Sequence, residues 1–425
     1  MKKVLELLGI AAIVLLLGAC SKGNGNQTPP ANLRFINGAT NQSLTVVLNG
    51  TVEFAGVAAE SASAYTSIAA GTYTISVTDV SGTLVSPAVN FAFSGSQAYS
   101  LVAYVRNGAV ITALIDDSQV TPPAGYGKLG VANISPDSGA LDVYVVAPGT
   151  TDLSQSAPVF QSAVFRGSPV WTTLVAGTFD VVVTGAGNPS DVRLTLPSVP
   201  VANGQVLALA FMSTPGGSLV NAMLDSLNGP AQFVSNTNAR VRIVSALPVN
   251  PATAVTGTIG TTTLSSVFAP NPGLYTLVAG GSSTYSIGVG AAQVASLPPA
   301  TFAAGGDFTI IVYGTVATPS VAVYTDNNQI PVVGGDVKLR LVNAAVSGGT
   351  GLTLYVNNVQ AASDVAYGAA SPYFAVATSS SAQLELVEPS VPPVFPPTVQ
   401  LSPSGSVYTV FVIDSTLTPY VIRDR

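Results

Sequence analysis

Hydrophobic and polar residues alternate strictly in several segments of the chain. In "GTYTISVT", Tyr73, Ile75 and Val77 are apolar, and threonine or serine stands between them. The same alternation recurs in "GTFDVVVTG" (177–185), "STYSIGVG" (283–290) and "SAQLELVEP" (381–389). Successive side chains of a strand point to opposite faces, so the pattern predicts strands with one buried and one wet face. Such strands are typical of antiparallel sheets.

These segments belong to a longer unit that the chain repeats four times. Each copy opens on a similar strand pattern: "NLRFINGAT" from Asn32, "KLGVANIS" from Lys128, "RVRIVSAL" from Arg240 and "KLRLVNAA" from Lys338. Each copy closes on a strand, a turn and a second strand, which end at Ser118, Ser226, Asn327 and Asp424. The repeat is as long as a whole domain, so it predicts separate domains and not the coils of a solenoid.

Short polar pairs between strand patterns predict tight hairpin turns. They are Asn49-Gly50, Asn107-Gly108 and, at the equivalent place in the fourth copy, Asn357-Asn358. A two-residue hairpin turn of this kind needs positive φ at both residues, which glycine and asparagine adopt with little strain.

We therefore predict an all-β fold of four tandem antiparallel β-sandwich domains of the Ig-like kind. Each copy offers about seven short strands in about 90 residues, the rhythm of such a sandwich. The predicted domains span residues 32–120, 126–227, 238–328 and 336–425. The linkers between them are short and rich in turn residues, so we expect a rod or a curved chain with restricted domain motion.

Residues 1–19 have the features of a secretory signal peptide. Lys2 and Lys3 precede an apolar run from Leu7 to Leu17, which is too short for a membrane-spanning helix. The exit, Leu17-Gly18-Ala19-Cys20, resembles the lipobox of bacterial lipoproteins, although Glu6 departs from the usual pattern. The resemblance implies cleavage before Cys20, acylation of its sulfur and of the new amino terminus, and anchoring to a membrane of the cell envelope.

Cys20 is the only cysteine, so an intrachain disulfide is excluded. The alternative to lipidation is a free or buried thiol in a true transmembrane anchor. Residues 20–31 continue as a polar, glycine-rich stretch, which predicts a flexible tether after the lipidated cysteine. Ser21 in place of aspartate implies, by the same resemblance, the outer membrane, with domains facing either the periplasm or the cell surface.

The charge of the chain limits its partners. Cleavage before Cys20 would remove Lys2, Lys3 and Glu6 and leave 12 basic and 19 acidic side chains, a net charge of −7. Nucleic acids and anionic lipid surfaces are bound through basic patches, so neither is expected as the main partner. The hydrophobic fraction of 48% is ordinary and predicts packed cores.

A second resemblance concerns the repeated unit. "ISPDSGALDVYV", residues 134–145, resembles the signature of the domain of unknown function 4397 family. The family pattern begins with an arginine in a hydrophobic strand, which Arg34, Arg242 and Arg340 match, and later contains Ala-Gly-Thr-Tyr, which residues 70–73 match. The resemblance extends over most of residues 32–425 and implies secreted or lipid-anchored bacterial domains, with no activity or catalytic residue to transfer.

The residue types needed for most catalytic sites are missing. Without histidine, and with Cys20 assigned to lipid, Ser-His-Asp and Cys-His catalysis and histidine-based metal sites are excluded. The candidates left are acids that end each copy: Asp116, Asp117, Asp225, Asp326 and Asp424. A facing carboxylate pair could hydrolyse glycans, and calcium could bind at 116–118 or 326–328. The repetition favours turn caps or domain junctions, so we predict no catalytic residue, cofactor or metal.

Arginines and aromatic residues leave two interpretations open. Arg34, Arg242 and Arg340 could line a ligand groove, or each could stack on an aromatic ring or pair with an acid of its own domain. Tyr65 and Trp171 fall at similar places in their copies. They could form a sugar-stacking surface, or pack at a core or sheet edge.

The sequence thus predicts a non-enzymatic envelope lipoprotein with tandem β-sandwiches that act in binding, adhesion or spacing. The possible ligands are a glycan or a protein. The alternatives are a carboxylate-based glycan-active enzyme and an accessory subunit of an outer-membrane assembly.

Overall fold

The computed structural model describes residues 28–425 apart from gaps at 40–41, 107, 167–168, 228, 249–251, 295–296, 346–350, 390–391 and 414–416. The signal peptide, Cys20 and most of the tether are predictions that fall outside the described residues. Every regular element of the described part is a β-strand, which confirms the all-β prediction. In this part of the chain no helix has the length and hydropathy that crossing a bilayer requires.

The strands form four units, and units 1 and 2 are described first. Unit 1 contains β1 (Ala31–Asn37), β2 (Leu44–Leu48), β3 (Thr51–Val57), β4 (Ser61–Ala62), β5 (Thr66–Ile68), β6 (Gly71–Asp79), β7 (Leu84–Phe93), β8 (Ala98–Arg106) and β9 (Ala109–Asp116). Unit 2 contains β10 (Tyr126–Asn133), β11 (Leu141–Val146), β12 (Phe160–Ala163), β13 (Val170–Val175), β14 (Gly177–Gly185), β15 (Asn188–Val201), β16 (Val206–Ser213), β17 (Val220–Ser226) and β18 (Ala231–Val234).

Units 3 and 4 follow the same plan. Unit 3 contains β19 (Asn238–Ala246), β20 (Val255–Ile259), β21 (Thr262–Val267), β22 (Thr276–Ala279), β23 (Gly281–Ser283), β24 (Tyr285–Val289), β25 (Ala292–Gln293), β26 (Ala300–Phe302), β27 (Asp307–Gly314) and β28 (Pro319–Asp326). Unit 4 contains β29 (Asp336–Ala344), β30 (Leu352–Val356), β31 (Val359–Val365), β32 (Ala369–Ala370), β33 (Phe374–Ala377), β34 (Ser379–Ala382), β35 (Leu384–Val387), β36 (Val399–Leu401), β37 (Val407–Ile413) and β38 (Thr418–Arg423).

Each unit is a sandwich of two main sheets around its own core, and units 3 and 4 each add a two-stranded sheet, β23-β26 and β34-β36. In unit 1 the sheets run β4-β1-β8-β9 and β3-β2-β6-β7, and in unit 2 they run β13-β10-β16-β17-β18 and β12-β11-β14-β15. The alternating segments of the sequence supply core residues as predicted: Ile75 and Val77 pack in unit 1, and Leu384 and Leu386 in unit 4. The prediction of tandem β-sandwiches is therefore confirmed.

The first strand of every unit pairs in parallel with the first strand of the unit's closing hairpin, a feature that the sequence patterns did not reveal. The pairs are β1 with β8, β10 with β16, β19 with β27 and β29 with β37. We call the sheet that holds each pair the inner sheet of its unit. The closing hairpin of the unit extends the inner sheet, which places the aspartate at its end beside the first strand of the hairpin, one strand away from the opening strand.

Two of the three predicted hairpin turns lie within the described residues. Asn49 and Gly50 have φ angles of 48° and 84° between β2 and β3, and Asn357 and Asn358 have φ angles of 50° and 63° between β30 and β31. Both turns are confirmed, because both central residues take the positive φ that this hairpin requires. Asn107 lies outside the described residues.

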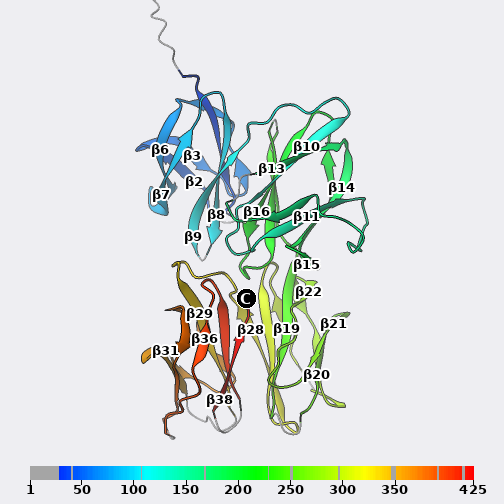
Figure 1. Ribbon diagram of the computed structural model, residues 1–425, viewed down its shortest axis with the longest axis vertical. Coiled ribbons are helices and arrows are strands. Elements are labelled where there is room, and N and C mark those ends of the chain that lie inside the picture. The colour runs from blue at the N-terminus through cyan, green and yellow to red at the C-terminus, as the bar shows by residue number, and fades with distance from the viewer. Residues whose placement is uncertain are drawn as a thin grey trace, which may run out of the picture.

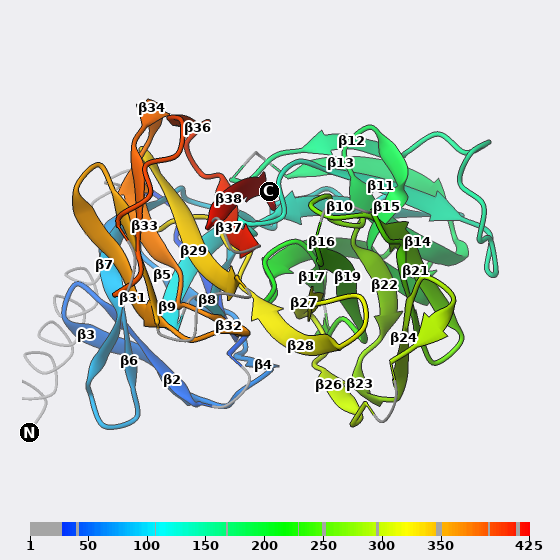
Figure 2. The same ribbon diagram turned by 90° about the horizontal axis from the view of Figure 1, so that it is seen from below.

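The expectation of a rod or a curved chain is wrong. Unit 1 packs its inner sheet against that of unit 2, and unit 3 does the same with unit 4, so two pairs stack along the long axis (Figures 1 and 2). A second apolar layer fills the first contact, with Ile36 and Val102 facing Ala210 and Met223. Its counterpart in the other pair joins Val244 and Ile311 to residues of unit 4 that include Phe411. The inner sheets are buried on both faces, which excludes a chain of separate bodies.

Candidate functional site

Two arginines cross the contact between units 3 and 4 in opposite directions. Arg242 of unit 3 donates to Asp424 of unit 4 at 2.5 Å, and Arg340 of unit 4 pairs with Asp326 of unit 3. Arg340 and Asp326 are almost fully buried, at 1% and 0% exposure. The two pairs therefore form a reciprocal lock between the inner sheets.

Each of these arginines is also held inside its own unit. The Nε group of Arg242 donates to Thr309 at 2.9 Å, and that of Arg340 donates to Thr409 at 3.1 Å. The guanidinium of Arg242 stacks on Tyr275, with 4.7 Å from Cζ to the ring centroid. That of Arg340 stacks on Tyr373 at 5.0 Å. The fork geometry of arginine allows it to bind threonine and carboxylate together.

The charges in this lock compensate each other. Burial by itself would raise the pKa of Asp326, but Arg340 and Arg242 outweigh it and hold that pKa below the usual range. Burial would lower the pKa of Arg340, but Asp326 outweighs this effect and raises it. The carboxylate and the guanidinium therefore both stay ionised.

Units 1 and 2 retain only one arm of this lock. Arg34 of unit 1 pairs with Asp225 of unit 2, donates through Nε to Ser100 at 2.8 Å and stacks on Tyr65 at 4.6 Å. In the strand register, the place of the arginine in unit 2 is taken by Gly130, beside Ala208.

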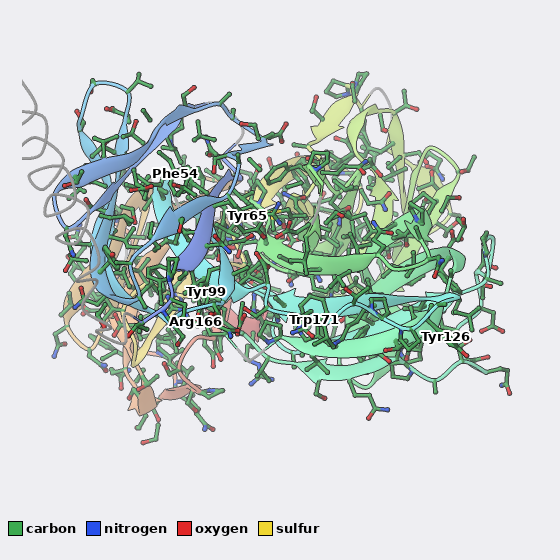
Figure 3. All side chains as sticks on the ribbon, turned by 90° about the horizontal axis from the view of Figure 1, so that it is seen from above. Phe54, Tyr65, Tyr99, Tyr126, Arg166 and Trp171 are labelled. Atoms are coloured by element: carbon green, nitrogen blue, oxygen red, sulfur yellow. The ribbon has the colours of Figure 1, made fainter. Side chains whose placement is uncertain are left out.

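Trp171 excludes a side chain at Gly130, because its ring stands where the Cβ atom would lie. It lies opposite Gly130 in the pairing of β10 with β13, and its ring stands 2.4 Å from where a Cβ on that glycine would lie. Tyr65 and Trp171 both lie near the middle of the view in Figure 3, whereas Tyr126 lies near its edge. In the pairing of β1 with β5, Leu33 lies opposite Thr66, so Tyr65 falls beside Arg34 as Trp171 falls beside Gly130, and the two rings hold equivalent positions beside the opening strands.

These contacts decide the alternatives that the sequence left open for the arginines. All three stack on a tyrosine, as one interpretation expected. The expectation that each pairs with an acid of its own domain is wrong, because every acid comes from the neighbouring unit. The physical reason is the face-to-face pairing, which brings the closing aspartate of one unit to the opening strand of the unit paired with it.

The closing acids serve the junctions in units 2, 3 and 4, and those of unit 1 are the exception. Asp225, Asp326 and Asp424 accept arginine across a contact, so Asp326 offers no open carboxylate edge for calcium or catalysis. Asp116 is exposed and caps a turn by accepting from the backbone N–H of Ser118 at 2.9 Å. Asp117 is buried without an arginine partner among the described residues. No group of three or more Cys, His, Asp or Glu side chains within the described residues could hold a metal.

The Ser-Pro-Asp turn of unit 2 joins three parts of the molecule. Asp137 is fully buried and accepts from Arg106 of unit 1 at 2.8 and 2.6 Å. It also accepts from Ser213 at 2.6 Å and from the backbone N–H of Ile330, in the segment between units 3 and 4, at 2.9 Å. The turn therefore connects the two stacked pairs as well as units 1 and 2.

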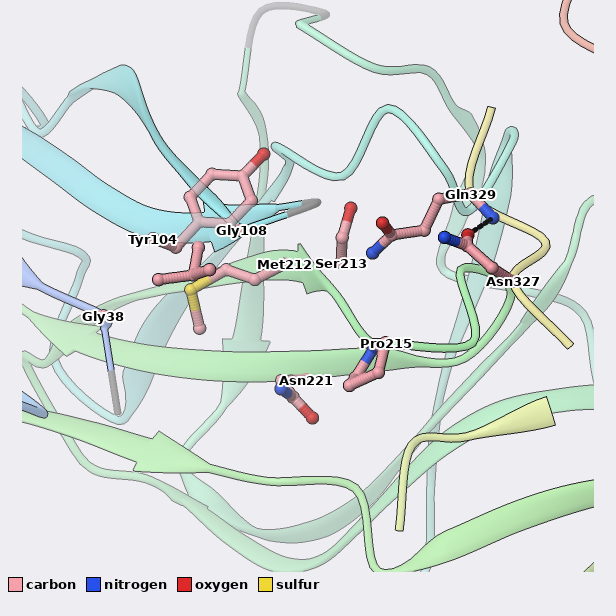
Figure 4. A pocket seen from close by; sticks show the side chains of 10 residues that line it. Gly38, Tyr104, Gly108, Met212, Ser213, Pro215, Asn221, Asn327 and Gln329 are labelled. Carbon is pink, nitrogen blue, oxygen red and sulfur yellow. Dashed lines mark hydrogen bonds between the residues drawn. The ribbon is translucent and has the colours of Figure 1, made fainter. Parts of the chain in front are cut away.

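A pocket of about 370 Å³ opens beside this turn, and we call it the junction pocket (Figure 4). It is lined by Gly38, Tyr104, Val105 and Gly108 of unit 1, by Met212, Ser213, Pro215 and Asn221 of unit 2, and by Asn327 and Gln329 from the end of unit 3. Pockets of this size accept small organic ligands. None of its described lining residues is charged, and no single unit could form it.

The protein fixes one end of each amide in the junction pocket. Asn221 accepts from the backbone N–H of Asn236 at 2.8 Å, and Gln329 donates to the carbonyl of Thr214 at 2.8 Å. Asn327 accepts from Lys338 at 2.9 Å. The bonds among described residues leave the amide nitrogens of Asn221 and Asn327 and the amide oxygen of Gln329 for a ligand. No local pattern marks these amides, because the units that bring them together are distant along the chain.

Comparison with known protein families matches residues 31–144, and the matching family is described as "Domain of unknown function (DUF4397)". The chain contains a DUF4397-like domain. The match covers unit 1, continues through the Ser-Pro-Asp turn and ends at Tyr144 in β11. No curated protein matches the chain.

Among solved structures, a candidate cell adhesion protein from Bacteroides uniformis ATCC 8492 is similar over 48% of this chain and 99% of its own, with 11% identity and a TM-score of 0.23. Family 41 carbohydrate-binding modules from streptococcal virulence factors are similar over 42% of this chain and 93% of their own, with 10% identity and a TM-score of 0.15. The Bacillus anthracis TIE protein covers 87% of this chain and 65% of its own, at 9% identity and a TM-score of 0.15. Likenesses of this degree carry no argument about function.

Proposed function

We propose that the protein is a lipid-anchored binding protein of a bacterial cell envelope and that its junction pocket takes a neutral, hydroxyl-rich ligand of the glycan class. The observation that carries the proposal is the junction pocket itself, a hollow of about 370 Å³ that three units assemble. Its uncharged amides can donate to and accept from hydroxyl groups, and Tyr104, Met212 and Pro215 add apolar surface.

The proposal is of a binding protein and not of an enzyme. Glycan hydrolysis would need two carboxyl groups facing the substrate, and the described lining of the junction pocket holds only neutral side chains. The acids that the sequence offered for catalysis at the contacts are engaged by arginine in three of the four units.

Isosteric substitutions in the pocket test the proposal. In Asn221→Asp, the oxygen that accepts from Asn236 is kept, and the free amide donor becomes an acceptor. A glycan identified on an array of neutral oligosaccharides should bind this variant about tenfold more weakly by calorimetry, because one donor is lost and charge repels the ring oxygens. Asn327→Asp should act in the same direction.

Asn90→Asp provides the matched control, because Asn90 is an exposed asparagine that bonds only Thr74 among the described residues. It should bind like the natural protein. Equal binding by all three variants, or no signal on the array above that of the denatured chain, would contradict the glycan proposal. The protein would then be better described as a spacer.

The membrane anchor is tested separately. Intact mass spectrometry of the protein purified from membranes should show cleavage before Cys20 and acyl groups on that residue, and Cys20→Ala should leave the membrane fraction. Several acyl chains are needed for this, since one chain gives only marginal binding. Protease treatment of intact cells would then distinguish a surface location in the outer membrane from a periplasmic one. An uncleaved start would contradict the anchor and leave the pocket proposal unaffected.

A further inference from the structure

The carboxylates at the contact between units 3 and 4 divide their two oxygens in the same way. In Asp326, Oδ2 accepts from Thr309 at 2.6 Å within its own unit, and Oδ1 accepts from Arg340 of the neighbouring unit. In Asp424, Oδ2 accepts from Thr409 at 2.6 Å, and Oδ1 accepts from Arg242. The Oδ1 atom is therefore the position at which a guanidinium arrives from outside the unit.

Asp117 has the same bonds to Oδ2 from its own unit but lacks the guanidinium at Oδ1. Its Oδ2 accepts from Ser100 at 2.6 Å and from Tyr65 at 2.7 Å, as the equivalent oxygen of Asp326 does from Thr309 and Tyr275. Its Oδ1 has no hydrogen-bond partner in the structure. Asp117 is 1% exposed. Unit 2 supplies no arginine to it, because Gly130 stands at the position that an arginine holds in the other opening strands.

The local charge is also unbalanced. Asp117 and Asp225 share the single guanidinium of Arg34, which donates to Ser100, to Asp225 and to two backbone carbonyls. The hydroxyl of Ser100 lies 2.6 Å from Oδ2 of Asp117 and 3.0 Å from Oδ2 of Asp225, and its one proton can serve only one of them. A buried carboxylate without a partner is strongly unfavourable. A second positive group would restore the balance found between units 3 and 4.

A pocket of about 540 Å³ lies at this carboxyl group, between units 1 and 2. Its lining includes the ring of Tyr65, the polar residues Asn32, Ser118 and Gln119, and, from unit 2, Val206 and Leu227. An aromatic ring and a carboxylate side by side are the two groups on which Arg242 and Arg340 are bound between units 3 and 4. Tyr65 already stacks with Arg34, and its counterpart Tyr275 stacks with two arginines, Arg240 and Arg242. The pocket is separate from the junction pocket, with which it shares no lining residue.

We propose that the pocket at Asp117 binds a guanidinium group supplied by a ligand, which takes the place that an arginine of the neighbouring unit fills elsewhere in the molecule. The guanidinium donates to Oδ1 of Asp117. The source is a small guanidinium compound or an exposed arginine side chain of a protein partner, since both present the same group.

Methylguanidinium and a capped Gly-Arg-Gly peptide serve as the probes, and tetramethylammonium serves as a cation without N–H donors. Millimolar methylguanidinium should raise the unfolding temperature of the full-length protein in detergent, and calorimetry should show saturable binding. Tetramethylammonium should do neither. Binding of the peptide as well as methylguanidinium would identify an arginine of a protein partner as a possible source, and binding of methylguanidinium alone would restrict the source to small compounds.

Asp117→Asn should weaken binding at least about tenfold, because it removes the charge-assisted bond. Asp116→Asn, a change at the neighbouring exposed acid, should leave it unchanged. The triple variant Gly130→Arg/Trp171→Tyr/Ala208→Thr rebuilds the arm that is missing from unit 2. Its own arginine should fill the site and abolish binding of methylguanidinium. This variant tests the site independently if Asp117→Asn does not fold.

Burial raises the pKa of Asp117, and the bonds from Ser100 and Tyr65 and the charge of Arg34 oppose that rise. If Asp117 were protonated and therefore neutral, it would not bind a cation. Saturable binding that is lost in Asp117→Asn supports the proposal. No binding to the natural protein, or equal binding to Asp117→Asn, overturns it.

Discussion

The contact between units 3 and 4 is reciprocal, whereas the contact between units 1 and 2 is one-sided. Both bury an apolar layer between inner sheets, but at the positions of the lock the first has two arginines and two acids and the second has one arginine and two acids, while a separate pair, Arg106 with Asp137, also joins units 1 and 2. In unit 2 the arginine, its hydroxyl partner and its tyrosine are replaced together by Gly130, Ala208 and Trp171. The difference teaches that the apolar layer sets the geometry of the pair, and that the polar set on one side can be exchanged as a block.

The largest expected effect is the loss of one arm of the reciprocal lock. Arg340→Met leaves the fully buried Asp326 without its arginine and should destabilise the protein by about 3–5 kcal/mol in urea unfolding. The double variant Arg340→Met/Asp326→Asn should be less destabilised, because the unpaired charge is also removed. If the double variant were no better than the single one, the charge would not be the source of the loss.

Truncation of the shared apolar layers should have the next largest effect and should be similar in both pairs. Met223→Ala between units 1 and 2 and Ile413→Ala between units 3 and 4 each remove a side chain that is at most 1% exposed. Each should lower the free energy of unfolding by about 2–4 kcal/mol. Val52→Ala, at a side chain that is 55% exposed, is the control and should change stability by less than about 0.5 kcal/mol. A much smaller loss in one pair would show that its layer does not carry the contact.

A smaller, pH-dependent effect is expected at Lys338, on the opening strand of unit 4. Burial lowers the pKa of Lys338 to about 7 from an ordinary value of 10.5. Between these values the unfolded chain binds more protons than the folded one, so stability should rise with pH across this window. Lys338→Met should flatten the rise in thermal unfolding, whereas Lys128→Met, at the equivalent place in unit 2, should not. An unchanged slope in Lys338→Met would contradict the assignment.

The smallest expected effect is that of Asp117→Asn near neutral pH. The pKa of Asp117 is raised in the folded protein, so ionisation of this carboxyl group opposes folding. The stability that the protonated group contributes is fully present at a pH below the pKa of the unfolded chain. It is lost as the pH rises through the pKa of the folded protein. The amide should therefore leave stability unchanged or raise it slightly, in contrast to Asp326→Asn in the reciprocal pair. A large loss in Asp117→Asn would show that this carboxylate is paired after all.

Much of each unit could be predicted from the sequence. The alternation around Ile75 and Leu386 and the turn at Asn49-Gly50 are local signals, because a strand and a two-residue hairpin are specified by the residues within them. The three arginines and the closing acids were also identified, but their partners were not. An acid of the same unit and an acid of the next one look alike along the chain.

The pairing of units left a signal that the strand-by-strand interpretation did not use. The first strands of the closing hairpins are nearly unbroken apolar runs, and every residue of β16 and β37 is buried. Such runs are typical of strands covered on both faces. The amides of the junction pocket are different: Asn221 and Gln329 acquire a common role only through the stacking of the pairs, which no local pattern records.

The second covered face of the inner sheets bears on how chains of this kind can change in length. A unit that lost its neighbour would expose a layer of Ile, Val, Met and Phe side chains to water, and such a surface promotes aggregation. Gain or loss of a single copy would leave one such apolar surface exposed to water, whereas gain or loss of two copies would leave none exposed. The even number of copies in this chain is thus the number that duplication of a whole pair of units would produce.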